Sequence, residues 1–135
     1  IGTFNPIRSQ NIFDHEMHAE YGEINKQSAI MISNTLKAGG RVIPVGTTCL
    51  RILESMAIKD KKLNPFSGYT NIFITPGYKF KIASGLITNF HLPKSSLFIL
   101  VSSFVGLENA KKIYSHAIRR NYRFFSYGDG SILLK

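Results

Sequence analysis

Histidines and carboxylates gather in one short segment, H-E-M-H-A-E at residues 15–20, which offers groups for acid–base chemistry. His15 and His18 are three residues apart, and Glu20 follows them closely. Histidine titrates near neutral pH, and a neighbouring carboxylate can orient it for proton transfer. The H-E-x-x-H zinc pattern is absent, which disfavours a metal site. An exposed polar loop has the same composition, and spacing alone favours that alternative.

A second polar group follows a Gly-Thr-Thr turn at residues 46–48. A β-branched run at residues 41–45 precedes this turn, and a helical pattern over residues 49–57 follows it. Such a turn presents backbone N–H groups and the positive end of the helix dipole to an anion. Arg51 and Glu54 share one helical face, where they either contact a ligand or form a surface ion pair worth about 0–1 kcal/mol. Neither a Walker lysine nor G-x-G-x-x-G is present, so no nucleotide motif supports the site.

Two further segments, residues 88–93 and 122–129, mix polar and aromatic residues. The first holds Asn89, His91 and a turn fixed by proline, and the second holds several aromatic rings and Asp129. These residue types form base-stacking or ligand pockets. Ordinary turns and core aromatics explain the same composition, so both interpretations stay open.

The last helical pattern has a basic face opposite an apolar stripe. Its basic residues are Lys111, Lys112, Arg119 and Arg120, with Arg123 just beyond. They can contact phosphate groups, or form a solvated helix face as charge runs usually do.

Alternating helical and strand patterns predict a layered α/β domain around these residues. We expect helices over residues 26–38, 49–57, 96–105 and 107–118, with Asn25 and Ser95 or Ser96 as N-caps and glycines at the C-terminal ends. We expect strands over residues 18–24, 41–45, 71–75, 78–82, 86–88 and 131–134, and a surface loop over 59–68.

Length and composition exclude several classes of protein. The 135 residues suit one domain, and 44% apolar residues argue against disorder. The single cysteine, Cys49, excludes an internal disulfide framework and is expected to be buried. No apolar run approaches a membrane span and no secretion signal is visible, so a cytoplasmic location is expected. The net charge of +9 favours an anionic partner such as nucleic acid, and a lysine-rich background explains it equally well.

Six segments in order resemble the S-adenosylmethionine:tRNA ribosyltransferase-isomerases of queuosine biosynthesis. They are G-T-F-x-P (residues 2–6), H-x-M-H-x-E (15–20), G-x-V-I-x-V-G-T-T-x-x-R-x-L-E (40–54), I-F-I-x-P-G-Y-x-F (72–80), T-N-F-H-L-P-x-S (88–95) and Y-R-F-F-S-Y-G-D (122–129). Each segment is modest by itself, and their order makes the resemblance specific.

The resemblance implies that S-adenosylmethionine donates its ribosyl group to 7-aminomethyl-7-deazaguanine at the wobble position of a tRNA. The product is epoxyqueuosine, and adenine and methionine are released. No metal is implied, and no cofactor beyond S-adenosylmethionine as co-substrate. The implied catalytic residues are His15, His18, Glu20 and His91. The implied substrate-binding residues are Thr3, Thr47, Thr48, Arg51, Glu54, Tyr78, Asn89, Tyr127 and Asp129. The implied contacts for the tRNA backbone are Lys111, Lys112, Arg119, Arg120 and Arg123.

The implied fold is a discontinuous layered α/β domain with a mixed sheet and an inserted β-barrel domain. The family chain is longer, so residues 1–135 are expected to be the C-terminal portion of the α/β domain, without the barrel. This portion alone is expected to be inactive, and activity would need the missing N-terminal part from another chain. The chain departs from the family pattern at residues 83–85 and 130–131. Two alternatives are a non-catalytic basic module that binds tRNA and a non-functional remnant of a split gene.

Overall fold

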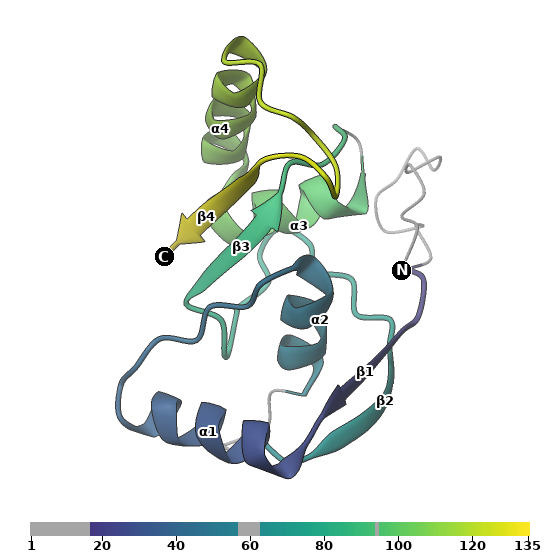
Figure 1. Cartoon of the computed structure of the whole chain (residues 1–135), viewed down its shortest axis with the longest axis vertical. Coiled ribbons are helices and arrows are strands. Elements are labelled where there is room, and N and C mark those ends of the chain that lie inside the picture. Colours follow the sequence, from purple (N-terminus) through teal and green to yellow (C-terminus); the bar gives the residue numbers. More distant parts are fainter. Residues whose placement is uncertain (1–16, 57–62, 94) are drawn as a thin grey trace.

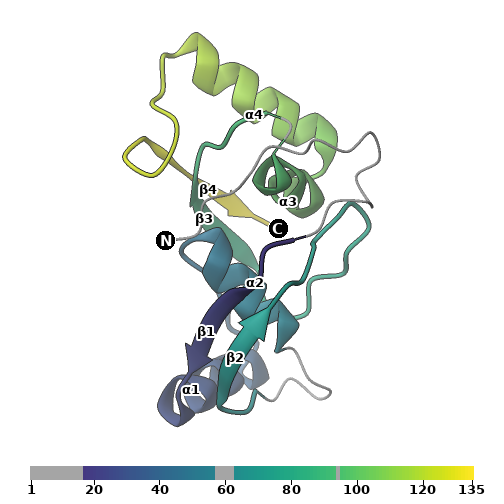
Figure 2. The same cartoon turned by 90° about the vertical axis from the view of Figure 1, so that its right-hand side faces the viewer.

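The computed structural model describes residues 17–56, 63–93 and 95–135 of the chain (Figure 1). Strands β1 (Glu20–Ile24) and β2 (Phe66–Thr70) pair antiparallel, and so do β3 (Gly85–Asn89) and β4 (Gly130–Leu134). The helices are α1 (Lys26–Lys37), α2 (Thr47–Ser55), α3 (Ser96–Val105) and α4 (Leu107–Arg119). Figures 1 and 2 show α3, α4, β3 and β4 gathered in one half, with α1, β1 and β2 in the other and α2 between them.

The helix ends follow local sequence signals. The side chain of Asn25 accepts a hydrogen bond from the Ser28 N–H at 2.8 Å, and Ser95 caps α3 through the Phe98 N–H at 3.2 Å. Gly106 adopts φ 83°, a conformation open to glycine, and separates α3 from α4. These predicted caps are confirmed. Helix α2 begins at Thr47, two residues earlier than expected, and leaves Cys49 exposed where a buried thiol was expected.

Strand β3 and Ala83, which lies two residues before it, pair with one parallel segment and one antiparallel strand. Val42 and Val45 form parallel bridges with Ala83 and Ile87, while β4 runs antiparallel to β3. The predicted strand over residues 41–45 is therefore reduced to two bridges, yet the arrangement around β3 is mixed, as expected.

Two predicted strands are absent from the described residues, because side chains bind their backbone groups. Residues 71–75 and 78–82 are not strands, and β2 instead covers Phe66–Thr70, partly inside the predicted surface loop. The Arg51 guanidinium binds the carbonyl of Ile72, and the Glu54 carboxylate accepts the N–H groups of Lys81 and Ile82. Backbone groups occupied in this way are not free for a ladder.

The larger hydrophobic core lies between α3, α4 and the β3–β4 pair. Helix α3 is apolar nearly all round and supplies Leu100, Val101 and Phe104, while α4 supplies Ala110 and Tyr114. A smaller core joins Ile24 of β1 to Ala29 of α1 and to Leu63 and Ile82. Helix α2 contacts β1, β2 and β3, so it links the two halves.

Strand β1 packs against α2 through a position without a side chain. A Cβ atom on Gly22 would overlap Cδ1 of Ile52 and lie 2.6 Å from its Cγ1. Glycine therefore lets Ile52 sit directly on the strand, two residues from Glu20.

No helix within the described ranges is long and apolar enough to cross a bilayer.

Candidate active site

The start of α2 lies beside the carboxyl end of β3. The Gly46 N–H donates to the Ile87 carbonyl at 2.8 Å, and the Ile87 N–H donates to the Pro44 carbonyl at 2.9 Å. Because residues 42–45 run parallel to β3, both segments end at the same edge. Ligands of α/β proteins commonly bind where parallel strands end and a helix begins. Thr47, Thr48 and Asn89 follow these ends, so the structure brings together two of the predicted segments.

Glu20, at the start of β1, is held by two residues of α2. Thr48 Oγ1 donates to Glu20 Oε1 at 2.8 Å, and Arg51 Nη1 pairs with Glu20 Oε2. Arg51 is completely buried, and it also donates to the carbonyls of His18 at 3.2 Å and Ile72 at 3.0 Å. Burial lowers the pKa of Arg51, and the charge of Glu20 opposes that shift. One guanidinium thus fixes the backbone and the carboxylate of the segment that carries His18.

Glu54 lies on the same helix and serves a different set of partners. It is 2% exposed and accepts hydrogen bonds from the Lys81, Ile82 and Ala83 N–H groups at 2.8–3.0 Å and from the Tyr78 hydroxyl at 3.2 Å. Burial and the Glu54 charge raise the pKa of Tyr78 to about 12. The alternative of a surface ion pair between Arg51 and Glu54 is wrong, because both are buried and bind elsewhere.

His91 is partly buried, and both its ring and its backbone form hydrogen bonds. Its Nε2 shares a hydrogen bond with Thr88 Oγ1 at 2.9 Å, and its backbone N–H donates to the Tyr114 hydroxyl at 3.1 Å. Burial lowers the pKa of His91 to about 4. The ring is therefore neutral at physiological pH.

The loop that follows α4 closes on the end of β3. Asn89 Nδ2 donates to the carbonyls of Gly128 and Asp129 at 3.4 Å, and the Phe125 N–H donates to the Phe90 carbonyl at 2.9 Å. Asp129 accepts from the Arg123 N–H at 2.7 Å and from Nη2 of Arg123 at 3.3 Å. The first of these bonds is the main cause of the lowered pKa of Asp129. Asn89 and Asp129 thus hold the loop, while Tyr127 points away at 98% exposure.

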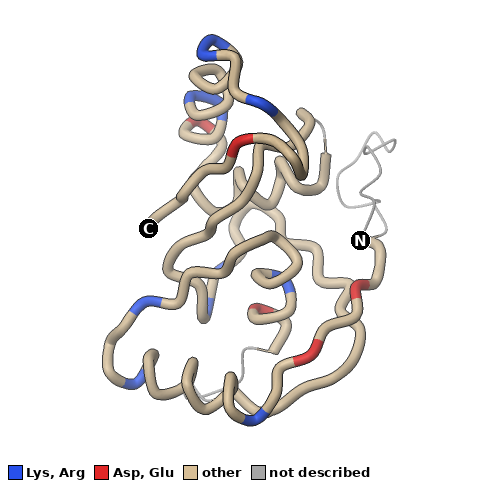
Figure 3. Tube along the Cα trace, viewed as in Figure 1, with Lys and Arg blue, Asp and Glu red and all other residues tan. Residues whose placement is uncertain are grey.

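The predicted basic residues all lie on the surface. Lys111, Lys112, Arg119, Arg120 and Arg123 are exposed. Figure 3 shows basic segments at the outer end of α4 and along the loop beyond it. Thr3 and His15 lie outside the described residues. Within the described ranges, no three His, Cys, Asp or Glu side chains gather as a metal site.

A family model described as queuosine biosynthesis protein matches residues 1–133. The chain belongs to the queuosine biosynthesis protein family. The match includes every polar cluster described above.

Curated relatives in this family carry the name S-adenosylmethionine:tRNA ribosyltransferase-isomerase. The protein from Sphingopyxis alaskensis is 56% identical over 133 residues, which cover 98% of this chain and 38% of the relative. The protein from Ruegeria pomeroyi is 53% identical with the same coverage. A crystal structure of S-adenosylmethionine tRNA ribosyltransferase from Thermotoga maritima is similar with a TM-score of 0.79 and 38% identity. It matches 84% of this chain and 40% of that one, so the chain spans about two-fifths of its relatives.

The sequence patterns did not predict two groups that form hydrogen bonds with site residues of this queuosine family chain. The Tyr114 hydroxyl and the Ile72 carbonyl are structural partners of His91 and Arg51. Tyr114 lies in the apolar stripe of α4, and a buried tyrosine needs a partner for its hydroxyl. The sequence could therefore have predicted that the Tyr114 hydroxyl has a hydrogen-bond partner, but not which residue that partner is.

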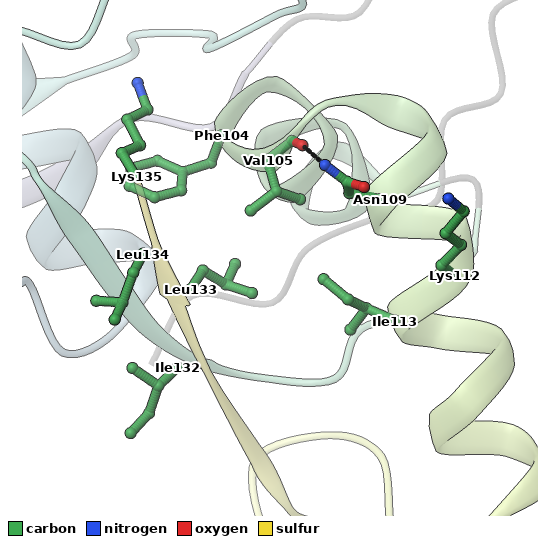
Figure 4. Close-up of a pocket in the computed structure, with 9 residues that line it drawn as sticks. All are labelled: Phe104, Val105, Asn109, Lys112, Ile113, Ile132, Leu133, Leu134 and Lys135. Carbon is green, nitrogen blue, oxygen red and sulfur yellow. Dashed lines mark hydrogen bonds between the residues drawn. The ribbon is translucent and has the colours of Figure 1, made fainter.

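A separate cavity lies between β4 and the α3–α4 corner of this queuosine family chain (Figure 4). Its volume is about 480 Å³, and apolar side chains such as Val105, Ile113 and Leu133 line it. Asn109 donates to the Val105 carbonyl at 2.9 Å, while Lys112 and Lys135 supply the charges. Of the predicted catalytic residues that the structure describes, none lines this cavity.

Proposed function

We propose that this chain is the C-terminal portion of the α/β domain of an S-adenosylmethionine:tRNA ribosyltransferase-isomerase. The reaction transfers and isomerises the ribosyl group of S-adenosylmethionine onto 7-aminomethyl-7-deazaguanine at the wobble position of a tRNA. It gives epoxyqueuosine and releases adenine and methionine. The observation that carries the proposal is 56% identity over 133 residues to a relative of that name.

The geometry supports acid–base roles for two parts of the site. Glu20 is an oriented carboxylate next to His18, and His91 is a neutral ring next to the hydroxyl of Thr88. Removing a ribose proton and assisting the departure of adenine need groups of this kind. His15 belongs to the same proposal from the sequence. Thr47, Thr48 and Asn89, at the carboxyl end of β3, are the proposed contacts for S-adenosylmethionine, together with Thr3.

Arg51 and Glu54 are better suited to position the site than to touch the substrate. Both are buried, and each binds several groups of this chain. We assign Arg51 to the placement of Glu20 and His18, and Glu54 with Tyr78 to the placement of residues 81–83.

The basic residues of α4 and its following loop are the proposed contacts for tRNA phosphates. The rest of the enzyme would come from the N-terminal part of the family chain, on the same polypeptide or a separate one. We propose a cytoplasmic location for this activity, because its proposed substrate is a tRNA.

A chimera tests the function directly. The 133 matching residues of the Sphingopyxis alaskensis relative are replaced by the corresponding residues of this chain. We expect the chimera to release adenine from S-adenosylmethionine and to form epoxyqueuosine in substrate tRNA, as read by mass spectrometry of digested tRNA. His18→Ala in the chimera should lower turnover far more than it lowers the melting temperature.

Two results would contradict the proposal. A folded chimera that binds S-adenosylmethionine and tRNA but releases no adenine would favour the non-catalytic tRNA-binding module. Wild-type turnover of the His18→Ala chimera would remove His18 from the chemistry.

A further inference from the structure

The loop after α4 holds two exposed aromatic rings on a rigid frame. Tyr127 is 98% exposed and Phe125 is 56% exposed. Among the described residues, no hydrogen bond or ring contact involves the Tyr127 side chain. Exposed single aromatics are common, but two exposed aromatic side chains two residues apart at the tip of a closed loop indicate a contact surface.

The frame of this loop is fixed at both ends. Helix α4 ends with Asn121 at φ 56°, and the Tyr122 N–H donates to the Ala117 carbonyl at 2.9 Å, which is a Schellman C-cap. The Asp129 N–H donates to the Arg123 carbonyl at 2.8 Å and closes the far end. A Cβ on Gly128 would lie 2.5 Å from the Phe124 carbonyl oxygen, so the closure needs glycine.

The ring of Phe125 is exposed at a conformational cost. Phe125 adopts φ 69°, a left-handed conformation that a bulky residue rarely takes. Its N–H donates to Phe90 and its carbonyl accepts from the Gly128 N–H at 2.9 Å, so the backbone is held in that state. Neighbouring Phe124 packs against Phe90 and Tyr114 instead. The loop thus buries one phenylalanine and turns the next one outward.

Basic residues lie in the same stretch of chain as the two rings. Arg119, Arg120 and Arg123 are exposed, and Arg123 also pairs with Asp129. Figure 3 shows basic segments at the outer end of α4 and on the loop beyond it. Exposed aromatic rings beside arginines are typical of surfaces that bind single-stranded nucleic acid, where unpaired bases stack on the rings and phosphates contact the cations.

We infer that Tyr127, with Phe125 beside it, forms a stacking platform for an unpaired base of the tRNA anticodon loop. Asp129 and Asn89 keep the platform in place without touching the RNA. This inference rests on the proposed function for the identity of the RNA, and it gives the loop a role separate from S-adenosylmethionine binding.

Binding of an anticodon stem–loop hairpin by the chain tests the platform. Tyr127→Ala should weaken binding about 5- to 150-fold, the range expected for one base–aromatic stack, whereas Tyr127→Phe should keep most of the affinity. The dependence of binding on salt concentration should not change in Tyr127→Ala, because every cation that faces a phosphate is still present. A blunt duplex of the same stem, with no unpaired base, should bind both proteins equally. Tyr69→Ala is the matched control, since Tyr69 is 73% exposed on β2.

Several outcomes would overturn the inference. They are unchanged hairpin affinity in Tyr127→Ala, an equal loss in Tyr69→Ala, and a loss of affinity for the duplex as large as that for the hairpin. If Tyr127→Ala instead weakens association with the N-terminal part of the family chain and leaves RNA binding intact, the ring is a protein contact and the inference is wrong. An inactive chimera with Tyr127-dependent hairpin binding would refute the proposed function and support the platform. An active chimera that does not need Tyr127 for hairpin binding would do the reverse.

Discussion

The carboxylate of Glu20 is paired with the guanidinium of Arg51, and the two lie 31 positions apart in the sequence. The Glu20 side chain is 9% exposed and that of Arg51 is fully buried. The pair joins the start of β1 to the middle of α2. It therefore decides where the backbone of His18 lies relative to the turn at Thr47 and Thr48.

Removing the positive partner of this pair should be costly. We expect Arg51→Met to lower the free energy of unfolding by about 3–5 kcal/mol, because Glu20 is left as an uncompensated charge. Arg51→Lys should cost less, since it keeps the charge and loses only the planar fork of the guanidinium. Urea unfolding measures both. Arg41→Met, at an exposed position, is the control and should stay within about 0.5 kcal/mol of the parent protein. A loss in Arg51→Met no larger than in the control would show that the pair does not stabilise the fold.

We expect a similar sensitivity at Glu54, which in the described part of the chain is held by hydrogen bonds and not by an ion pair. Glu54→Gln keeps the shape of the side chain but turns an amide N–H₂ toward the backbone N–H groups of residues 81–83, which can only donate. We expect the free energy of unfolding to fall by about 1–3 kcal/mol for a buried donor left without an acceptor. Glu23→Gln on the exposed side of β1 is the matched control. Equal urea midpoints for the two variants would count against a structural role for this carboxylate.

The low pKa of His91 predicts a pH dependence of stability. The unfolded chain binds a proton at His91 as the pH falls through 6.5, whereas the folded chain resists protonation until about pH 4. The unfolded state therefore holds more protons in this window, and the free energy of unfolding falls as the pH drops from about 6.5 to 4. The contribution amounts to roughly 3 kcal/mol at most.

Replacing the ring isolates this contribution. In His91→Gln the fall between about pH 6.5 and 4 should be shallower than in the parent protein, because the carboxyl groups that titrate there are common to both. Gln27→Ala, an exposed position on α1 that carries no titrating group, is the control and should keep the parent slope. If the free energy of unfolding of His91→Gln has the same pH dependence as that of the parent protein, the pKa of His91 is not lowered in the folded state.

The basic end of α4 predicts a salt-dependent affinity for tRNA. Arg119→Ala combined with Arg120→Ala should reduce the slope of log affinity against log salt by about 0.9 for each phosphate that is no longer neutralised. Lys26→Ala with Lys37→Ala removes two exposed charges from α1 and should leave the slope unchanged. Filter binding of tRNA over a salt series gives both slopes. Equal slopes in the two double variants would show that the basic face of α4 is exposed to solvent and does not contact tRNA phosphates.

The sequence predicted those parts of the fold that depend on near neighbours. The caps at Asn25 and Ser95, the stop at Gly106 and the apolar stripe of α4 are all read within one or two helical turns. The family resemblance was likewise carried by short segments in order, and the comparisons confirm it.

Contacts between distant residues were harder to predict. Arg51 and Glu54 have the spacing of a surface pair, and only the packing of α2 against β1 and residues 81–83 shows that both are buried. The apolar runs at residues 71–75 and 78–82 look like strands, but side chains more than 20 positions away take their hydrogen bonds. A period-two pattern cannot tell a strand from an extended segment bound by side chains.

The missing side chain at Gly22 sets the distance between β1 and α2. Any larger residue there would overlap the side chain of Ile52, on the helix that carries Thr48 and Arg51. The absence of a side chain at Gly22 therefore determines how close the Glu20 carboxylate on β1 lies to α2. No atom of that glycine takes part in the chemistry. We expect enlargement at position 22 to be tolerated only together with a smaller residue at position 52, so that these two positions vary as a pair.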